Sequence, residues 1–487
     1  MPLPAKRVAI IGAGPSGAIA VDALVQEGAF DVVRVFERQE KAGGNWVSRA
    51  NEQATPLDIN ALSARTADPP IPIPPDLPTH TAPITTHRYT DSHIYPGLHT
   101  NVDASVMEYS AESIPEVRSD WSIGLHGPDT PFRHHEVVCG YIEGLLSRNG
   151  YQDLVQYNTT VERAVKDEAT GEWVLTLRRA GKGKGEGEGD GEVGKDYWWT
   201  ERFDAVVVAS GKYHVPYVPE IPGLKEFAER YPGCVEHAKQ YRGPAKYKGK
   251  KVVTIGASVS AADTAVSLIN HAQSPIYAIV RGKYNVYFGD HAFAHPSIER
   301  RPPISRIDSA NGARTIHLED GTSITDVDHL IFGTGFSWTL PFLPDLEIRN
   351  NRVPGLYLHV FHERDPGLVF LGAVGAGLTF KVFEWQAVAA ARVLAGKAVL
   401  PGVEERRRWE EERIRVKGDG TGFLMVNPDF EEYFEQLRGV AGDPGEDGVG
   451  RRLPEFEQKW VDDFWAGHER RIRMWKRANE AARGPKI

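Results

Sequence analysis

The sequence predicts an α/β protein with two Rossmann-like dinucleotide-binding domains. Two glycine-rich turns of the same design, at residues 12–17 and 256–261, are the first observation behind this prediction. Each turn follows a short apolar run, opens a stretch of helical character and is followed by a second β-rich run, which is the order of a βαβ unit. The apolar runs are Val8–Ile11 and Val32–Phe36 in the first unit, and Val252–Ile255 and Ile276–Val280 in the second.

The glycines of the first turn have the spacing that is typical of a turn that binds the pyrophosphate of a dinucleotide. Its glycines allow a tight turn, close approach of the phosphates and close packing of the helix on the strand. The helix that follows directs unpaired N–H groups and the positive end of its dipole at the phosphates. We therefore expect Gly12, Gly14, Ser16 and Gly17 to contact the first dinucleotide.

The second turn departs from this pattern at two positions. Ser258 and Ala261 stand where the second and third glycines are expected. Serine is small enough for the pyrophosphate to approach, and Ala261 adds one methyl group where helix and strand pack. We expect Gly256, Ser258 and Ser260 to contact the second dinucleotide, and Asp263 to cap N–H groups in the first helical turn.

Opposite charges follow the second strand of each unit, and they predict which dinucleotide each unit binds. Glu37 and Arg281 occupy the same offset from the first glycine of their turns. A carboxylate there suits a free ribose diol and repels a 2′-phosphate, whereas a guanidinium suits the phosphate. The prediction is FAD in the first site and NADPH in the second, with Lys283 as a further group for the 2′-phosphate.

The predicted domain order is an FAD-binding domain with an inserted NADPH-binding domain. Residues 1–215 form the first part of the FAD domain, residues 216–331 the NADPH domain, and residues 332–487 the second part of the FAD domain. A proline-containing linker at 213–222 marks the first crossing between the domains. The return crossing is expected just after the apolar strand 329–332.

For three segments outside the two βαβ units, the sequence predicts a structure but no function. The proline-rich segment 47–95 is interpreted as a long surface excursion, and the stretch 181–195, rich in glycine and charge, as a loop. The charged, tryptophan-rich C-terminal region is interpreted as peripheral helices. Its arginine cluster at 470–477 is expected on a solvated helix face.

Composition and charge argue against several classes of function. The chain has 487 residues, 41% apolar and 25% charged, as soluble globular proteins do. Its net charge of −9 gives no support for a nucleic-acid partner. No apolar run reaches the roughly 18 residues of a membrane span, and no secretory apolar region opens the chain, so a cytoplasmic location is expected. The two cysteines, Cys139 and Cys234, and the pair His134-His135 lack the spacing of a metal site, and no metal is predicted.

A motif between the two turns is similar to the fingerprint of the flavin-containing monooxygenases. The fingerprint has an aromatic residue, glycine, histidine and a second aromatic residue, and Tyr231, Gly233, His237 and Tyr241 match it in order. The first position is usually Phe in that family. The Baeyer–Villiger branch usually has Trp at the last position, so Tyr241 favours the branch that oxygenates heteroatoms. The resemblance implies a structural role for His237, which would join the connector to the NADPH domain.

Further motifs resemble segments of the same family, and they follow in the family order from about residue 6 to residue 400. The matching segments are Gly43–Trp46, Tyr95–Asn101, Phe332–Phe336 and Phe380–Ala387. The resemblance implies that Gly44, Trp46, Thr100 and Gln386 bind FAD, and that Gly333 and Gly335 form a linker. Lys381 stands where the family often has proline.

The resemblance also implies an activity. NADPH would reduce FAD, the reduced flavin would form a C4a-hydroperoxide with O₂, and this species would oxygenate a soft nucleophile at nitrogen or sulfur. Asn101 matches an Asn that lies near the flavin in the family, and it is the candidate catalytic residue. Its amide offers a donor and an acceptor without a charge. The implied partners are a small-molecule substrate and O₂, and a homo-oligomer is possible.

Three other functions stay open from the sequence alone. Baeyer–Villiger oxygenation of a ketone would use the same cofactors. A disulfide reductase would use the same two-nucleotide fold but needs a redox dithiol, and the two cysteines lie far apart without a C-x-x-C motif. A nucleotide-binding redox sensor without turnover is supported only by Ser258 and Ala261 in the second turn.

Overall fold

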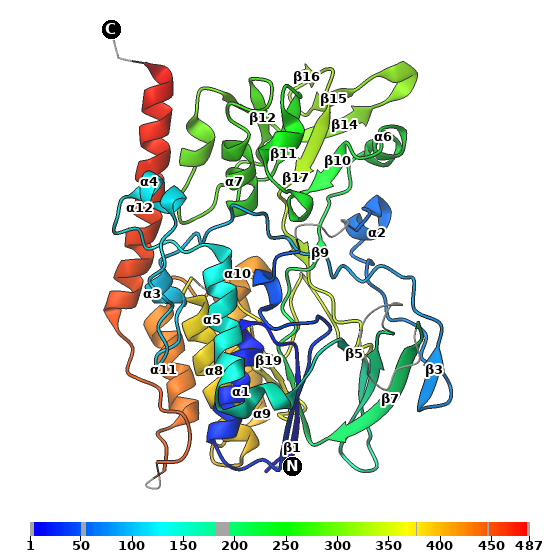
Figure 1. Cartoon of the computed structure of the whole chain (residues 1–487), viewed down its shortest axis with the longest axis vertical. Coiled ribbons are helices and arrows are strands. Elements are labelled where there is room, and N and C mark those ends of the chain that lie inside the picture. Colours follow the sequence, from blue (N-terminus) through cyan, green and yellow to red (C-terminus); the bar gives the residue numbers. More distant parts are fainter. Residues whose placement is uncertain (1–3, 50–54, 182–193, 376, 446–447, 485–487) are drawn as a thin grey trace.

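The computed structural model describes residues 4–49, 55–181, 194–375, 377–445 and 448–484. Most of the glycine- and charge-rich stretch 181–195 therefore lies outside the described residues. The fold is α/β, as the sequence predicts, and it contains two separate sheets that are wholly or largely parallel. Figure 1 shows these two sheets in the lower and upper halves of the molecule.

The larger sheet has seven strands in the order β19-β20-β21-β8-β1-β2-β4. Its five strands from β21 to β4 are parallel. The glycine turn of the first unit, residues 12–17, follows β1 and therefore lies at the carboxyl edge of these strands. The bounds are β1 Arg7–Ile11, β2 Val32–Phe36, β4 Val155–Gln156, β8 Ala205–Val208, β19 Leu356–Tyr357, β20 Phe361–His362 and β21 Leu368–Phe370. The helices α1 (Pro15–Gln26), α5 (His135–Ser147) and α8 (Thr379–Leu394) share one hydrophobic core with this sheet.

The second sheet has five parallel strands in the order β10-β17-β11-β12-β13. The bounds are β10 Val235–His237, β11 Val252–Ile255, β12 Ile276–Ile279, β13 Ile298–Arg301 and β17 His329–Phe332. The helix α7 (Val259–Ser267) follows the second glycine turn, so the predicted βαβ unit is present. The division of the chain into domains at residues 215 and 331 stays a prediction, although these strands all lie between residues 235 and 332.

Smaller elements complete the two halves. A four-stranded antiparallel sheet lies beside the larger sheet, a three-stranded sheet lies beside the second one, and a two-stranded ribbon joins the two crossings of the chain. Their strands are β3 Thr79–Thr81, β5 Thr159–Lys166, β6 Trp173–Arg179, β7 Asp196–Phe203, β14 Ile304–Asp308, β15 Thr315–Leu318, β16 Ser323–Ile324, β9 Val215–Pro216 and β18 Phe336–Ser337. The short helices are α2 Ile59–Ser63, α3 Ala104–Met107, α4 Asp120–His126 and α6 Leu224–Arg230.

The segment 47–95 is more than the surface excursion that its prolines predict. Its strand β3 pairs with β7, and Arg88 forms ion pairs with Asp68 and Glu162 at 2.6 and 2.7 Å. Leu62 and Tyr89 are buried in the core that serves the second sheet. Prolines break regular structure but leave apolar side chains free to pack, which explains why composition alone misjudged this segment.

The C-terminal region forms four helices, and they are not merely peripheral. They are α9 Val403–Lys417, α10 Thr421–Leu424, α11 Phe430–Ala441 and α12 Gln458–Arg483. Phe434 of α11 packs on Trp385 of α8 with ring centroids 4.9 Å apart. Figure 1 shows α12 as a long helix along one side of the molecule. Its Phe464 packs in the core of the larger sheet, and its Trp475 packs in a core of the second sheet. Among the described residues, no helix is both long enough and apolar enough to cross a bilayer.

Candidate active site

One cavity of about 570 Å³ lies at the carboxyl edge of the larger sheet and extends to the second glycine turn. The first unit contributes Gly12, Gly14 and Ser16 to its wall, and the second unit contributes Val259 and Asn285. Residues of both dinucleotide-type turns therefore border the same cavity. The arrangement therefore suits transfer of a hydride between two bound dinucleotides.

The first turn owes its shape to the absence of side chains at two glycines. Gly12 has φ +103°, and a Cβ there would lie 2.7 Å from the carbonyl oxygen of Ala209. A Cβ on Gly17 would lie only 1.9 Å from the carbonyl oxygen of Gly12. Helix α1 therefore packs directly on the strand end, as the sequence predicts. The N-terminus of α1 has no side-chain cap, so its first N–H groups are available to a phosphate.

Glu37 stands at the end of β2 and lines the cavity. Its carboxylate accepts hydrogen bonds from the backbone N–H groups of Ala13 at 2.7 Å and Gln39 at 2.8 Å. Burial raises the pKa of Glu37, and these two hydrogen bonds oppose the rise. Each carboxylate oxygen accepts one bond and keeps a lone pair, so the group remains able to bind a ribose diol.

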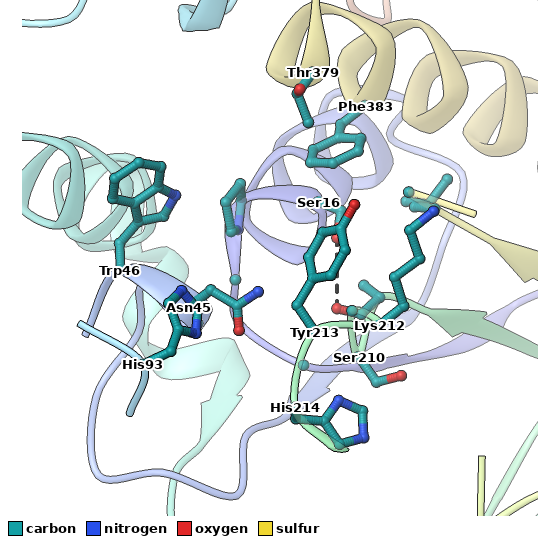
Figure 2. A pocket seen from close by; sticks show the side chains of 18 of the residues that line it. Ser16, Asn45, Trp46, His93, Ser210, Lys212, Tyr213, His214, Thr379 and Phe383 are labelled. Atoms are coloured by element: carbon teal, nitrogen blue, oxygen red, sulfur yellow. Dashed lines mark hydrogen bonds between the residues drawn. The ribbon is translucent and has the colours of Figure 1, made fainter. Parts of the chain in front are cut away.

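The segment from Gly43 to Trp46 lies against the first turn. The backbone N–H of Gly43 donates to the carbonyl of Ala13 at 3.0 Å, and a Cβ on Gly44 would lie 2.8 Å from Cα of Gly14. Trp46 lines the cavity, and Figure 2 shows it together with Asn45 on the side of the pocket opposite Lys212. Gly44 and Trp46 both line the cavity, and their contact with the first dinucleotide stays a prediction.

Asn101 lies in the wall of the cavity. Its side-chain amide makes no hydrogen bond with the residues that the structure describes, so it is available to a bound molecule. Thr100 is buried and does not line the cavity. Its hydroxyl donates to the carbonyl of Val102 at 2.9 Å and accepts from the N–H of Arg133 at 3.1 Å. Thr100 therefore shapes the loop that presents Asn101.

Gln386 also lies outside the cavity lining. It is fully buried in α8, where its side-chain oxygen accepts from the N–H of Gly372 at 2.9 Å and its amide donates to the hydroxyl of Tyr433 at 2.9 Å. Gly372 itself lines the cavity. In this structure Gln386 positions a wall residue and does not face the cavity directly.

In the second turn, the glycine and the alanine that meet between helix and strand have exchanged places relative to the first turn. The Ala261 methyl group of α7 faces Gly333, where an added Cβ would lie 2.7 Å from Ala261. In the first unit the glycine is on the helix, as Gly17, and the alanine, Ala209, follows the strand. The departure at Ala261 is therefore compensated at Gly333. This reciprocal pattern preserves the close approach of α7 to β17, and Gly256 keeps φ +126°.

The polar residues predicted for NADPH lie at the surface around the second turn. Ser258 and Ser260 are exposed, and the hydroxyl of Ser258 accepts from the Asn285 amide at 3.2 Å. Arg281 and Lys283 are exposed and make no ion pair with the described residues. Their charges remain available to a 2′-phosphate. The N-terminus of α7, like that of α1, has no side-chain cap.

Two expectations about charged side chains are wrong. Asp263 does not cap α7; its carboxylate accepts from Arg471 of α12 at 2.6 Å. The cluster 470–477 is not simply solvated, because Arg470 pairs with Asp129 at 2.6 Å and Arg477 donates to the carbonyl of Leu125 at 3.0 Å. These arginines bind partners that are distant in the sequence, and a local sequence pattern does not reveal such partners.

The fingerprint residues hold the connector against the second sheet. His237 ends β10, is buried, and accepts from the N–H of Lys239 at 3.1 Å; burial lowers the pKa of His237 to about 3. The Tyr241 hydroxyl lies 2.5 Å from that of Ser267 at the end of α7. Tyr231 donates to the carbonyl of Ala313 at 3.0 Å. Gly233 and Gly335 have φ values of +78° and +81°.

Two titratable side chains of the cavity wall, Lys212 and His93, have lowered pKa values. Lys212 donates to the carbonyl of Val374 at 2.7 Å, and burial lowers its pKa to about 8. Burial, with Lys239 and Arg242 nearby, lowers the pKa of His93 to about 4. Figure 2 shows Lys212 and Tyr213 extending into the pocket from the end of β8, with Phe383 of α8 above them.

Sequence reasoning missed several residues of the wall. They are Lys212, Tyr213, Tyr287, Phe464 and His468. Lys212 and Tyr213 come shortly after the end of β8, and residues at the carboxyl end of a parallel strand are a usual place for ligand contacts. That rule would have found them. Phe464 and His468 belong to α12 and carry no local signal.

The fold and the site define a flavoprotein oxidoreductase with two dinucleotide sites. The model of the flavin-binding monooxygenase-like family matches residues 92–287 and 305–442, and that of an NAD(P)-binding Rossmann-like domain matches residues 10–69. The chain belongs to the flavin-binding monooxygenase-like family. The predicted family, the α/β fold class with its Rossmann-like domain, and the oxidoreductase class are confirmed.

Named relatives and a solved structure agree with this assignment. Flavin-containing monooxygenase ustF2 of Aspergillus flavus is 28% identical over 88% of this chain and 90% of its own length. The trimethylamine monooxygenase of Methylocella silvestris is 28% identical over 86% of this chain and 82% of its own length. The structure of S-allyl-L-cysteine S-oxygenase from Allium sativum aligns with a TM-score of 0.72 at 25% identity, covering 100% of this chain and 97% of that one. The family supports FAD and NADPH as the cofactors, as predicted.

Proposed function

We propose that this protein is an NADPH-dependent monooxygenase that transfers one atom of O₂ to a nitrogen or sulfur atom of a small molecule. The other oxygen atom leaves as water, and NADPH supplies the two electrons. The single cavity that both glycine turns share supports this proposal most directly. Two relatives whose names describe amine and thioether oxygenation support the choice of nitrogen or sulfur.

When bound, FAD accepts the hydride and activates dioxygen, which are reactions that no side chain supplies. The protein positions the cofactors and excludes water. The α1 N-terminus binds the FAD pyrophosphate, and Glu37 binds the ribose diol. Arg281 and Lys283 bind the 2′-phosphate of NADPH. Apolar cavity residues such as Leu98, Val102, Met107, Phe380 and Met425 keep water from the reacting atoms.

The proposal is tested by measuring oxygenated product per NADPH consumed with three substrate classes. Trimethylamine and S-allyl-L-cysteine represent the nitrogen and sulfur nucleophiles, and cyclohexanone represents a ketone. We expect an N-oxide or an S-oxide and no lactone. Lactone as the main product would replace the proposal with Baeyer–Villiger oxygenation, and negligible NADPH consumption by flavin-loaded protein would indicate a sensor. A homo-oligomer and a cytoplasmic location stay predictions.

Replacing Arg281 by alanine is expected to weaken NADPH binding about 10- to 100-fold, because a hydrogen-bonded charge pair is worth about 1.5–3 kcal/mol. NADH lacks the 2′-phosphate, so its binding should change little. The measurement is the dissociation constant of each dinucleotide. Arg306→Ala, an exposed arginine on β14 of the same half, is the matched control. Equal losses for NADPH and NADH would contradict this assignment of the second site.

Replacing Asn101 by alanine is expected to leave NADPH oxidation running while oxygen is lost as H₂O₂. The oxygenated product per NADPH should fall about 10-fold or more, because a preorganised donor contributes roughly 10²-fold to a reaction that develops charge. Product and H₂O₂ are measured together. A slower reduction of the flavin with unchanged coupling would assign Asn101 to the hydride step instead.

A further inference from the structure

The C-terminal helix α12 forms part of the cavity wall. Phe464 and His468 of α12 line the cavity, together with Tyr287 from the second half. The ring centroid of Tyr287 lies 5.1 Å from those of both Phe464 and His468. The family match ends at residue 442, so the part of the wall that α12 contributes lies beyond the region that the family model describes.

The first half of α12 is anchored at two points, and this limits the movement of the side chains between them. Near its start, Trp460 packs against Trp385 of α8 with ring centroids 5.6 Å apart. Further along, Arg471 donates to Asp263 of α7 at 2.6 Å. His468 lies one turn before Arg471 and is 4% exposed. His468 therefore lies between the position where α12 packs on α8 and the position where it binds α7.

The hydrogen bonding of His468 shows which ring nitrogen is free. Nδ1 lies 2.9 Å from the carbonyl oxygen of Phe464. A carbonyl oxygen only accepts, so Nδ1 carries the proton and Nε2 holds a lone pair. Nε2 makes no hydrogen bond with the residues that the structure describes. Burial, together with the charge of Arg471, lowers the pKa of His468 and keeps the ring neutral.

We propose that His468 is a specificity-determining residue whose Nε2 accepts a hydrogen bond from an uncharged N–H or O–H group of a molecule bound in the cavity. A bound group that donates to Nε2 replaces the hydrogen bond that water would supply, whereas an apolar group covers Nε2 and leaves it without a partner, which is costly. The Arg471 guanidinium disfavours a cationic donor at this position. Two sources offer the required group: the carboxamide of the nicotinamide, and a hydroxyl or amide group of the substrate.

The nearby second turn is the reason to test the nicotinamide as the source of the donor. Tyr287 packs on His468, and Asn285, two residues earlier in the same loop, donates to Ser258 of that turn. The substrate source rests on the proposed function, whereas the nicotinamide source rests only on the dinucleotide site. The experiment therefore has one arm for each source.

The test compares wild-type protein with His468→Phe, which keeps a ring but loses the acceptor, and His468→Gln, whose amide oxygen replaces Nε2. Glu469→Gln, an exposed change on the same helix, is the control. In the first arm, the dissociation constants of NADP⁺ and its 3-acetylpyridine analogue are measured by calorimetry on the FAD-loaded protein. The analogue has a methyl ketone in place of the carboxamide. In the second arm, KM is measured for 2-(methylthio)ethanol and for methyl propyl sulfide, its isostere without the hydroxyl.

In one arm we expect wild-type protein to prefer the donor-bearing molecule about 3- to 10-fold, as for one neutral hydrogen bond. His468→Phe should abolish that preference, and His468→Gln should retain most of it. The arm that responds identifies the source. The inference is overturned if wild-type protein gives equal dissociation constants for the two dinucleotides and equal KM values for the two sulfides, and this result needs no variant to fold. It is also overturned if His468→Phe keeps the wild-type preference. If wild-type protein oxidises neither sulfide, these two thioethers are not substrates, and the calorimetric arm alone decides the role of His468.

Discussion

Replacing Gly17 by alanine is expected to give a protein without bound FAD, with a free energy of unfolding lowered by about 3 kcal/mol. The added Cβ would lie 1.9 Å from the carbonyl oxygen of Gly12, well inside the contact distance of the two atoms. Either α1 moves away from β1 or the turn changes shape. Both changes move the N–H groups that bind the pyrophosphate. The measurements are the flavin absorbance per chain and a denaturant unfolding curve.

The control for this prediction is Gly140→Ala in α5. Gly140 is also a helical glycine, but a Cβ there would meet nothing within 4 Å. Alanine favours a helix over glycine by about 1 kcal/mol, so this variant should be as stable as the wild type or slightly more stable. Because both changes are the same chemically, their difference isolates the steric effect at the turn. Full flavin occupancy and unchanged unfolding in Gly17→Ala would refute the packing argument.

The parts of the fold that the sequence predicted are those with local signals. The strands β2 (Val32–Phe36) and β17 (His329–Phe332) have the predicted bounds, and the helix α1 (Pro15–Gln26) follows the first glycine turn as predicted, because apolar runs and glycine turns are local features of the chain. The reach of α12 was missed. Arg471 finds Asp263 through the folded structure, and neither residue carries a local mark of that pairing.

The candidate site divides in the same way. Gly12, Gly14, Glu37 and Asn101 belong to short motifs, and the structure places all four in the cavity wall. His468 reaches the same wall from the far end of the chain. A histidine on a charged helix looks like any surface histidine until packing buries it. Motifs therefore indicated the cofactors, whereas the residues that shape the rest of the cavity depend on tertiary structure.

Replacing Gly333 by alanine is expected to impair the second site selectively. Its Cβ would lie 2.7 Å from N, Cα and Cβ of Ala261, so α7 must move away from β17. We expect a loss of about 2–3 kcal/mol in stability and weaker binding of NADP⁺. FAD should be retained, because the first turn is untouched. Calorimetry with NADP⁺ and the flavin absorbance measure the two sites separately, and loss of FAD would show that the two turns are coupled.

The double variant Ala261→Gly with Gly333→Ala tests whether the two units are packed reciprocally. It gives the second unit the arrangement of the first, where a Cβ on Gly17 would lie 3.6 Å from that of Ala209. Ala261→Gly alone should cost about 1 kcal/mol of helix stability. In combination it removes one of the three close contacts, and a small shift of α7 relieves the backbone contacts that remain. We therefore expect the double variant to be more stable than the sum of the single losses by about 1 kcal/mol, with part of the NADP⁺ affinity restored. Strictly additive losses would mean that the Cβ added at position 333 clashes with the backbone of α7 and not with the Ala261 methyl group.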